Sequence, residues 1–170
     1  MLILNKNSQQ GVALIVSLVM LLIMTLLAVS SMNTTILEEK MAGNYKDRNM
    51  AFQASEAGLR AGETYLRTTP ILPPFDGTTA GLYQPTSSGL PKWQVVNWAA
   101  SGQYRSYTAN LLSNISSPPN YIIEELQPVN ESGGSLEAGV ALESRFYRIT
   151  SNAVGGTDTA IVMLQSTYKR

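Results

Sequence analysis

The sequence predicts an α+β fold in which one long amino-terminal helix packs on an antiparallel sheet of about four strands. Three observations lead to this prediction. Residues 12–67 contain no proline and keep helical patterning throughout. Residues 70–91 then concentrate proline among Gly, Thr and Ser, which are the residues of turns and loops. Beyond them, apolar and aromatic runs of strand length alternate with Gly, Pro, Asn or Ser.

The first half of the helix, 12–32, is apolar on all sides. Its only polar residues are four Ser or Thr, and nothing ionisable lies between Lys6 and Glu38. At 1.5 Å per residue this segment is about 31 Å long, against a hydrocarbon core of about 30 Å. We therefore expect it to be able to span a membrane, with Lys6 favouring an amino terminus that stays in the cytoplasm.

A secretory signal peptide and a simple membrane anchor are two other interpretations of this segment. A signal peptide has an apolar core of about 7–15 residues before a small-residue cleavage site. Ala28-Val29-Ser30 has the composition of such a site, although the apolar core before it is long. A simple anchor usually gives way to a linker, whereas here the helical pattern continues to Arg67.

Residues 33–67 read as the amphipathic half of the same helix. Apolar residues recur there at helical spacing and form one stripe, which we expect to pack on the downstream sheet, with a coiled coil as the alternative. Gly58 and Gly62 each weaken a helix by about 1 kcal/mol relative to Ala. Their spacing would also let another helix or sheet approach closely. The residues of the predicted stripe are Leu37, Met41, Tyr45, Phe52, Leu59 and Leu66.

Residues 68–170 form a β-rich globular domain in this prediction. The sheet is expected to cover the apolar face of the amphipathic helix, which cannot bury that face alone. Gly155-Gly156-Thr157-Asp158 reads as a hairpin connection between the last two strands. Residues 130–139 read as a polar loop. The predicted strands are Trp93–Trp98, Tyr104–Ala109, Tyr121–Leu126, Phe146–Ala153 and Thr159–Tyr168.

The composition argues against several classes of function. Charged residues make up 14% of the chain, and 12 basic residues balance 12 acidic ones, so no long-range field favours a nucleic acid. The chain has no cysteine and no histidine, which removes disulfides, thiolate sites and the commonest general base. We therefore expect a protein that is not an enzyme and that needs no cofactor or metal.

Three clusters of side chains are candidate sites, and each has a simpler interpretation. Glu124 and Glu125 are neighbours in a strand, so they point to opposite faces and do not form an acid–base pair. The oxygen-rich loop 130–137 lacks the ligand spacing of an EF-hand calcium loop. Four aromatic residues offer a partner-binding patch, although packing in the core or at an edge is the simpler use. They are Trp93, Trp98, Tyr104 and Tyr107.

A short leader that ends at Gly11, an uncharged apolar helix that starts at Val12 and an amphipathic extension together resemble a type IV pilin. The stretches Ser31–Glu63 and Phe146–Arg170 resemble the PilX family of minor pilins in particular. The resemblance covers the helix and the last strands, about half of the chain, whereas residues 70–144 carry no usable resemblance. The resemblance implies the pilin fold.

The resemblance also implies how the chain is processed. A prepilin peptidase would cut after Gly11 and methylate the amine of Val12, so residues 1–11 would be a leader. Two positions depart from the usual pilin pattern. Val12 stands where most pilins have Phe, and Val16 stands where they usually have Glu at the fifth mature position.

The absence of this Glu has a physical consequence. A carboxylate in the apolar span costs about 2.5–3.5 kcal/mol on insertion scales. In the family it is thought to meet the amino terminus of an adjacent subunit. A subunit with Val16 makes no such contact and suits the end of a filament, where it has no neighbour above it. We therefore expect a place at or near the pilus tip.

The resemblance implies a structural subunit that helps prime pilus assembly within a tip-located minor pilin complex. Its partners would be other minor pilins, the major pilin, a tip adhesin, the prepilin peptidase and, before assembly, inner-membrane lipid. Its outer domain would lie in the periplasm. Two alternatives remain at this point: a type II secretion pseudopilin at the pseudopilus tip, and a membrane-anchored periplasmic binding or hydrolytic domain.

Overall fold

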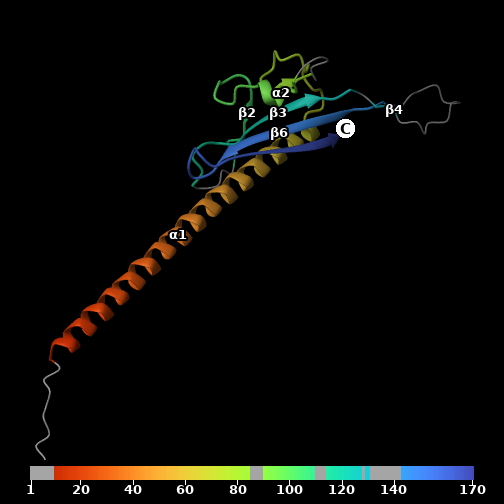
Figure 1. The fold of residues 1–170 in the computed structure, drawn as a ribbon. Helices are drawn as coiled ribbons and strands as arrows, with labels where there is room; N and C mark the ends of the chain where they lie inside the picture. The colour runs from red at the N-terminus through yellow and green to blue at the C-terminus, as the bar shows by residue number, and fades with distance from the viewer. Residues whose placement is uncertain (1–9, 85–89, 110–113, 128, 131–142) are drawn as a thin grey trace, which may run out of the picture. The chain divides into compact units, whose positions relative to one another are not determined.

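The computed structural model describes residues 10–84, 90–109, 114–127, 129–130 and 143–170. One helix, α1 (Gln10–Thr68), occupies the first part of the chain and confirms the prediction of a single long helix (Figure 1). The chain divides into two compact units, Met1–Gly43 and Asn44–Arg170. The second unit contains the rest of α1 together with all of the strands.

The main sheet has five strands and confirms an α+β fold with one long helix on a sheet. Its strand order is β1-β3-β6-β7, and β2 also pairs with β3. All pairs are antiparallel except β1 with β3, which makes the sheet mixed. A separate two-stranded ladder joins β4 (Val129–Asn130) to β5 (Glu143–Ser144). The strands of the main sheet are β1 (Leu82–Tyr83), β2 (Arg105–Ser106), β3 (Asn120–Glu125), β6 (Phe146–Val154) and β7 (Ile161–Lys169).

The three long strands lie where the sequence predicted them, and two other predictions need correction. The predicted strand 93–98 is wrong: Lys92–Val95 form a short helix, α2, which begins after Pro91 and closes with a 2.8 Å bond from Val96 N–H to Lys92 O. Proline has a fixed φ that suits a helix start. The predicted strand 104–109 keeps only Arg105–Ser106 in the ladder. β1 was missed because it lies within the glycine- and proline-rich segment.

The helix meets the sheet through a face of small residues. A Cβ added to Gly62 would lie 2.6 Å from Ile149 Cγ2, and one added to Gly58 would lie 3.2 Å from Ser151 Cβ, so both glycines are needed for this close approach. The Ser55 hydroxyl donates to Ser151 O at 3.1 Å in the same interface. The buried residues on this face of α1 are Ala51, Ala54, Ser55, Gly58, Gly62 and Leu66.

The predicted apolar stripe is only partly the packing face. Leu66 is buried in the main core and Leu59 packs partly against it. Leu37, Met41, Tyr45 and Phe52, in contrast, are all exposed. A seven-residue repeat drifts around a straight helix by about 20° per heptad, and bulky side chains do not fit where the backbone approaches the sheet this closely. The expectation that these four residues pack on the sheet is therefore wrong.

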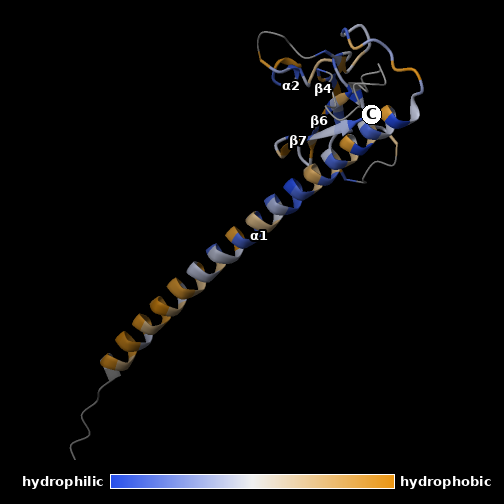
Figure 2. Ribbon diagram, turned by 90° about the vertical axis from the view of Figure 1, so that its right-hand side faces the viewer, coloured by the Kyte–Doolittle hydropathy of each residue, from blue (hydrophilic) through white to orange (hydrophobic). Residues whose placement is uncertain are grey.

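The amphipathic part of α1 runs in the same direction as β7. Asp47 contacts Thr157 just before β7 begins. Further along, Glu63 accepts a 3.1 Å bond from the hydroxyl of Ser166, which lies within β7. At the end of the strand, Arg170 donates to Thr69 O at 2.9 Å. Figures 1 and 2 show β6 and β7 lying along this part of the helix.

The turn between β6 and β7 is attached to the helix through one carboxylate. Asp47 accepts a 3.1 Å bond from Thr157 N–H and a second bond from the Thr157 hydroxyl. These hydrogen bonds hold the pKa of Asp47 below its ordinary value of 3.8, and the bond from the Thr157 hydroxyl has the largest effect. Gly155 lies so close to Asp47 that an added Cβ would overlap it. The predicted hairpin is thus confirmed, and its sequence is explained by this contact.

Asp47→Asn is expected to lower the thermal midpoint and to flatten its acid dependence. Because the folded pKa of Asp47 is depressed, its contribution is fully present above pH 3.8 and is lost as the pH falls further, through the folded pKa. Thermal unfolding of the full chain in detergent micelles measures the midpoints of both proteins. The pH is varied between roughly 2.5 and 5, the range in which carboxylates titrate. Asp76, whose pKa is also lowered by Thr78, titrates in both proteins. Parallel midpoint curves for the two proteins would contradict the assignment.

Candidate functional site

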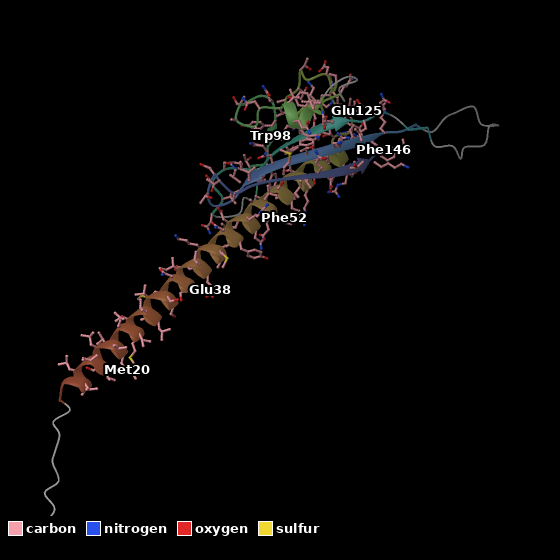
Figure 3. All side chains as sticks on the ribbon, viewed as in Figure 1. Met20, Glu38, Phe52, Trp98, Glu125 and Phe146 are labelled. Carbon is pink, nitrogen blue, oxygen red and sulfur yellow. The ribbon has the colours of Figure 1, made fainter. Side chains whose placement is uncertain are left out.

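The apolar half of α1 exposes all of its side chains. Val12 to Met32 carry Val, Leu, Ile and Met on every side, and each of these large residues is about half exposed or more. By length and composition, the stretch is long and apolar enough to cross a membrane, and its most apolar 18 residues are not buried. Figure 2 shows the mainly hydrophobic colour of this segment, and Figure 3 shows Met20 projecting from it.

Two of the four hydroxyl groups in this half are satisfied within the helix. Ser17 Oγ donates to Leu14 O at 2.9 Å, and Thr25 Oγ1 donates to Leu22 O at 2.8 Å. Such bonds to the preceding turn satisfy these two hydroxyl groups without water. The segment therefore suits surroundings that are apolar on all sides, either lipid or other apolar helices.

The predicted cleavage junction lies within the described helix. Gly11 and Val12 are both exposed, and an added Cβ at Gly11 would meet nothing within 4 Å. Val16 is 51% exposed on the same segment. From Gly11 to Leu37, α1 itself carries no acidic or basic side chain, and the first one along it is Glu38, which Figure 3 shows well beyond Met20.

Glu124 and Glu125 point to opposite faces, as the strand geometry predicted, and Glu124 is buried. Its Oε1 accepts a 3.1 Å bond from Lys92 N–H at the start of α2. Its Oε2 lies 3.8 Å from Arg148 Nη1. Glu125 is more exposed, and its Oε1 lies 3.7 Å from Arg145 Nη1. The buried carboxylate therefore attaches α2 to the outer face of the sheet, a structural role.

The predicted aromatic cluster packs mainly with itself and with the core. Trp98 and Tyr104 stack with ring centroids 6.4 Å apart, and Trp98 Nε1 donates to Trp93 O at 3.3 Å. Tyr107 packs against the main core. Core or edge packing, the simpler of the two interpretations, is the arrangement found. Figure 3 shows Trp98 on the opposite side of the sheet from α1.

Within the described residues, no group of three or more acidic or other ligating side chains could hold a metal ion. The candidate calcium loop, 130–137, lies outside the described residues except for the backbone of Asn130 in β4. The largest exposed apolar surface in the described part of the chain is the apolar half of α1.

A fully apolar helix segment that continues into a helix packed on an antiparallel-rich sheet defines a pilin-type subunit. Two protein-family models match this chain and identify its family. A model of the PilX N-terminal region matches residues 10–60, and a model of the type IV pilus assembly protein PilX C-terminal region matches residues 40–170. The chain belongs to the PilX family of type IV pilus assembly proteins. Neither a curated protein nor a solved structure matches it.

Proposed function

We propose that this protein is a minor pilin that helps to prime pilus assembly as part of a complex at the pilus tip. The observation that carries this proposal is the apolar half of α1, which is exposed on every side in a chain of the PilX family. A helix of this kind moves from lipid to a bundle of similar helices without exposing its side chains to water. Exposing one such Leu or Ile side chain to water instead would cost about 1.5–3 kcal/mol.

Val16 supports the place at the tip. A carboxylate at this position would reach toward the amine of a neighbouring subunit, and an exposed valine makes no such contact. The subunit therefore stabilises a filament through its apolar surface but does not need a charged neighbour above it. The same proposal includes cleavage after Gly11 and methylation of Val12. The proposed partners are other minor pilins, the major pilin and a tip adhesin.

The division of the chain follows from the same proposal. Residues 1–11 are the leader, 12–32 the membrane and filament-core half of the helix, 33–67 the amphipathic half, and 68–170 the globular domain in the periplasm. No catalytic group is proposed. The mechanism is packing of the apolar helix half against other helices.

Deleting the gene in the host and restoring it on a plasmid tests the priming role. We expect surface pili and twitching motility to be lost in the deletion strain and restored by the intact gene. Subunit counting on sheared pili should then find the protein at one end. An even distribution along the filament would contradict the tip location, and a defect in protein secretion with normal pili would favour a type II secretion pseudopilin instead.

A further inference from the structure

The main sheet has one long open edge, which is formed by β7. β6 pairs with one side of β7 along all nine residues, and no described strand pairs with the other side. At the opposite edge of the sheet, β1 and β2 both pair with β3. Ile161–Lys169 contains no proline, and its unbroken register with β6 leaves no room for a bulge. Prolines, bulges and inward charges are the usual devices that prevent an edge from pairing.

The hydrogen bonds at the two ends of the ladder show which backbone groups face this open edge. Gly155 N–H donates to Ala160 O at 3.0 Å, and Arg145 and Arg170 exchange bonds of 3.4 and 2.9 Å. Both pairs continue the β6–β7 register, so alternate residues from Val162 onward bond to β6. Between Ala160 and Tyr168, the residues that alternate with these direct their N–H and C=O groups outward, and no described residue bonds to those groups. These outward residues are Ile161, Met163, Gln165 and Thr167.

A groove of 490 Å³ lies between this edge and the flank of α1. Tyr45 and Phe52 contribute from the helix and are 74% and 47% exposed, although both are large and apolar. Ile161 and Met163 contribute from β7. Arg48 lines the same groove and forms no ion pair with any described residue. The labelled Phe52 in Figure 3 marks the helix side of this surface.

We propose that the β7 edge and this groove bind an extended segment of another pilus assembly component, which adds to the main sheet as a further strand. Its backbone pairs with the outward groups of β7, and its alternate side chains on the helix side lie over Tyr45 and Phe52. Those side chains are therefore apolar, and a carboxylate near Arg48 completes the charge match. The proposal rests on the proposed function only for the source of the segment.

A second copy of β7 does not suit this edge. Because α1 runs in the same direction as β7, antiparallel pairing of two β7 strands about a two-fold axis would make the two helices antiparallel. Subunits whose amino-terminal helices enter one membrane from the same side have parallel helices. A helix seated in the groove would cover Tyr45 and Phe52 but would leave the outward backbone groups unpaired. An extended segment satisfies both the backbone groups and the groove.

Hydrogen exchange at residue resolution tests the proposal on the full chain. In purified chain in detergent micelles, the amides of the four outward residues should exchange faster than those of their even-numbered neighbours. In the complex isolated from host membranes with other pilus components, the outward amides should slow by about 100-fold or more, as expected for newly formed ladder bonds.

Each other result overturns the proposal in a different way. Outward amides that stay fast in a complex containing pilus components would exclude strand addition and leave the proposed function intact. Slowing that appears in purified chain and grows with its concentration would identify a second copy. A host complex without any pilus component would count against both the strand proposal and the proposed function.

Two substitutions at one position separate the backbone from the side chain. Gln165→Pro removes an outward N–H, whereas Gln165→Val keeps it, and both lose the 3.2 Å bond from Gln165 to Thr150 Oγ1. We expect the Pro variant to be recovered in the complex about tenfold less than the Val variant, the effect of one lost ladder bond. Amide protection along β6 verifies that both variants fold, and Thr167→Pro repeats the test at a second outward residue. Equal recovery of the Pro and Val variants would overturn the proposal.

Discussion

Gly62→Leu is expected to destabilise the globular unit by about 3 kcal/mol, the upper part of the range for overpacking a core. A Cβ at this position would already lie 2.6 Å from Ile149 Cγ2, and Ile149 is fully buried in the main core. The longer side chain forces the helix away from β6 and breaks the nearby bond from Ser55 to Ser151. Denaturant unfolding of the full chain in detergent micelles, followed by circular dichroism, measures the loss.

Gly43→Leu is the matched control for this substitution. Gly43 lies in the same helix, but an added Cβ would meet nothing within 4 Å. Leucine is a better helix former than glycine by about 1 kcal/mol, so this variant should be at least as stable as the parent. Equal destabilisation by the two substitutions would mean that the close approach at Gly62 does not hold the helix on the sheet.

Leu21→Lys is expected to reduce incorporation of the protein into pili about 100-fold. Leu21 is 66% exposed in the middle of the apolar half, so the charge has no protein partner there. A lysine at the centre of a membrane-spanning helix costs about 2.5–3.5 kcal/mol, which corresponds to a factor of about 100 or more. Quantitative immunoblots of sheared pili, normalised to the amount of protein in cells, give the ratio.

Two controls accompany the lysine substitution. Leu21→Ile keeps the volume and the apolar character and should leave incorporation unchanged. Leu37→Lys places the same charge on an exposed residue next to Glu38, outside the apolar half, and should have a much smaller effect. If Leu21→Lys were incorporated as well as Leu37→Lys, the apolar half would not be the assembly surface.

The sequence predicted the long helix and the three long strands because each has a strong local signal. The helix has no proline before Pro70, and β3, β6 and β7 are rich in β-branched and aromatic residues. The weakest local signals gave the errors. Trp93–Trp98 is aromatic enough for a strand, yet Pro91 starts a helical turn there, and the two residues of β1 have no pattern that could be recognised.

The packing face of α1 shows why local patterns do not identify tertiary contacts. The large residues Tyr45 and Phe52 formed the obvious stripe, whereas the sheet contacts the small residues Ala54, Gly58 and Gly62. Small residues carry little hydrophobic signal, and their value depends on a partner surface that the sequence does not reveal. The glycine pair was the only indication of a close approach.

The open edge of β7 also lay beyond sequence analysis. Which backbone groups point outward depends on the register with β6, and that register is visible only once the strands are paired. The burial of Glu124 has the same origin, because it depends on α2 covering the outer face of the sheet. The predicted assembly residues 12–32, in contrast, needed only composition and length.

The amino terminus of the mature chain shows whether this protein is processed as a prepilin. Intact-mass and amino-terminal analysis of the protein from membranes of its own host should find a chain that begins at N-methylated Val12. A Gly11→Lys variant should keep the leader and remain uncleaved. A mature chain that begins at Met1 or near Ser31 would contradict the account, since it would identify an ordinary anchor or a secretory signal peptide.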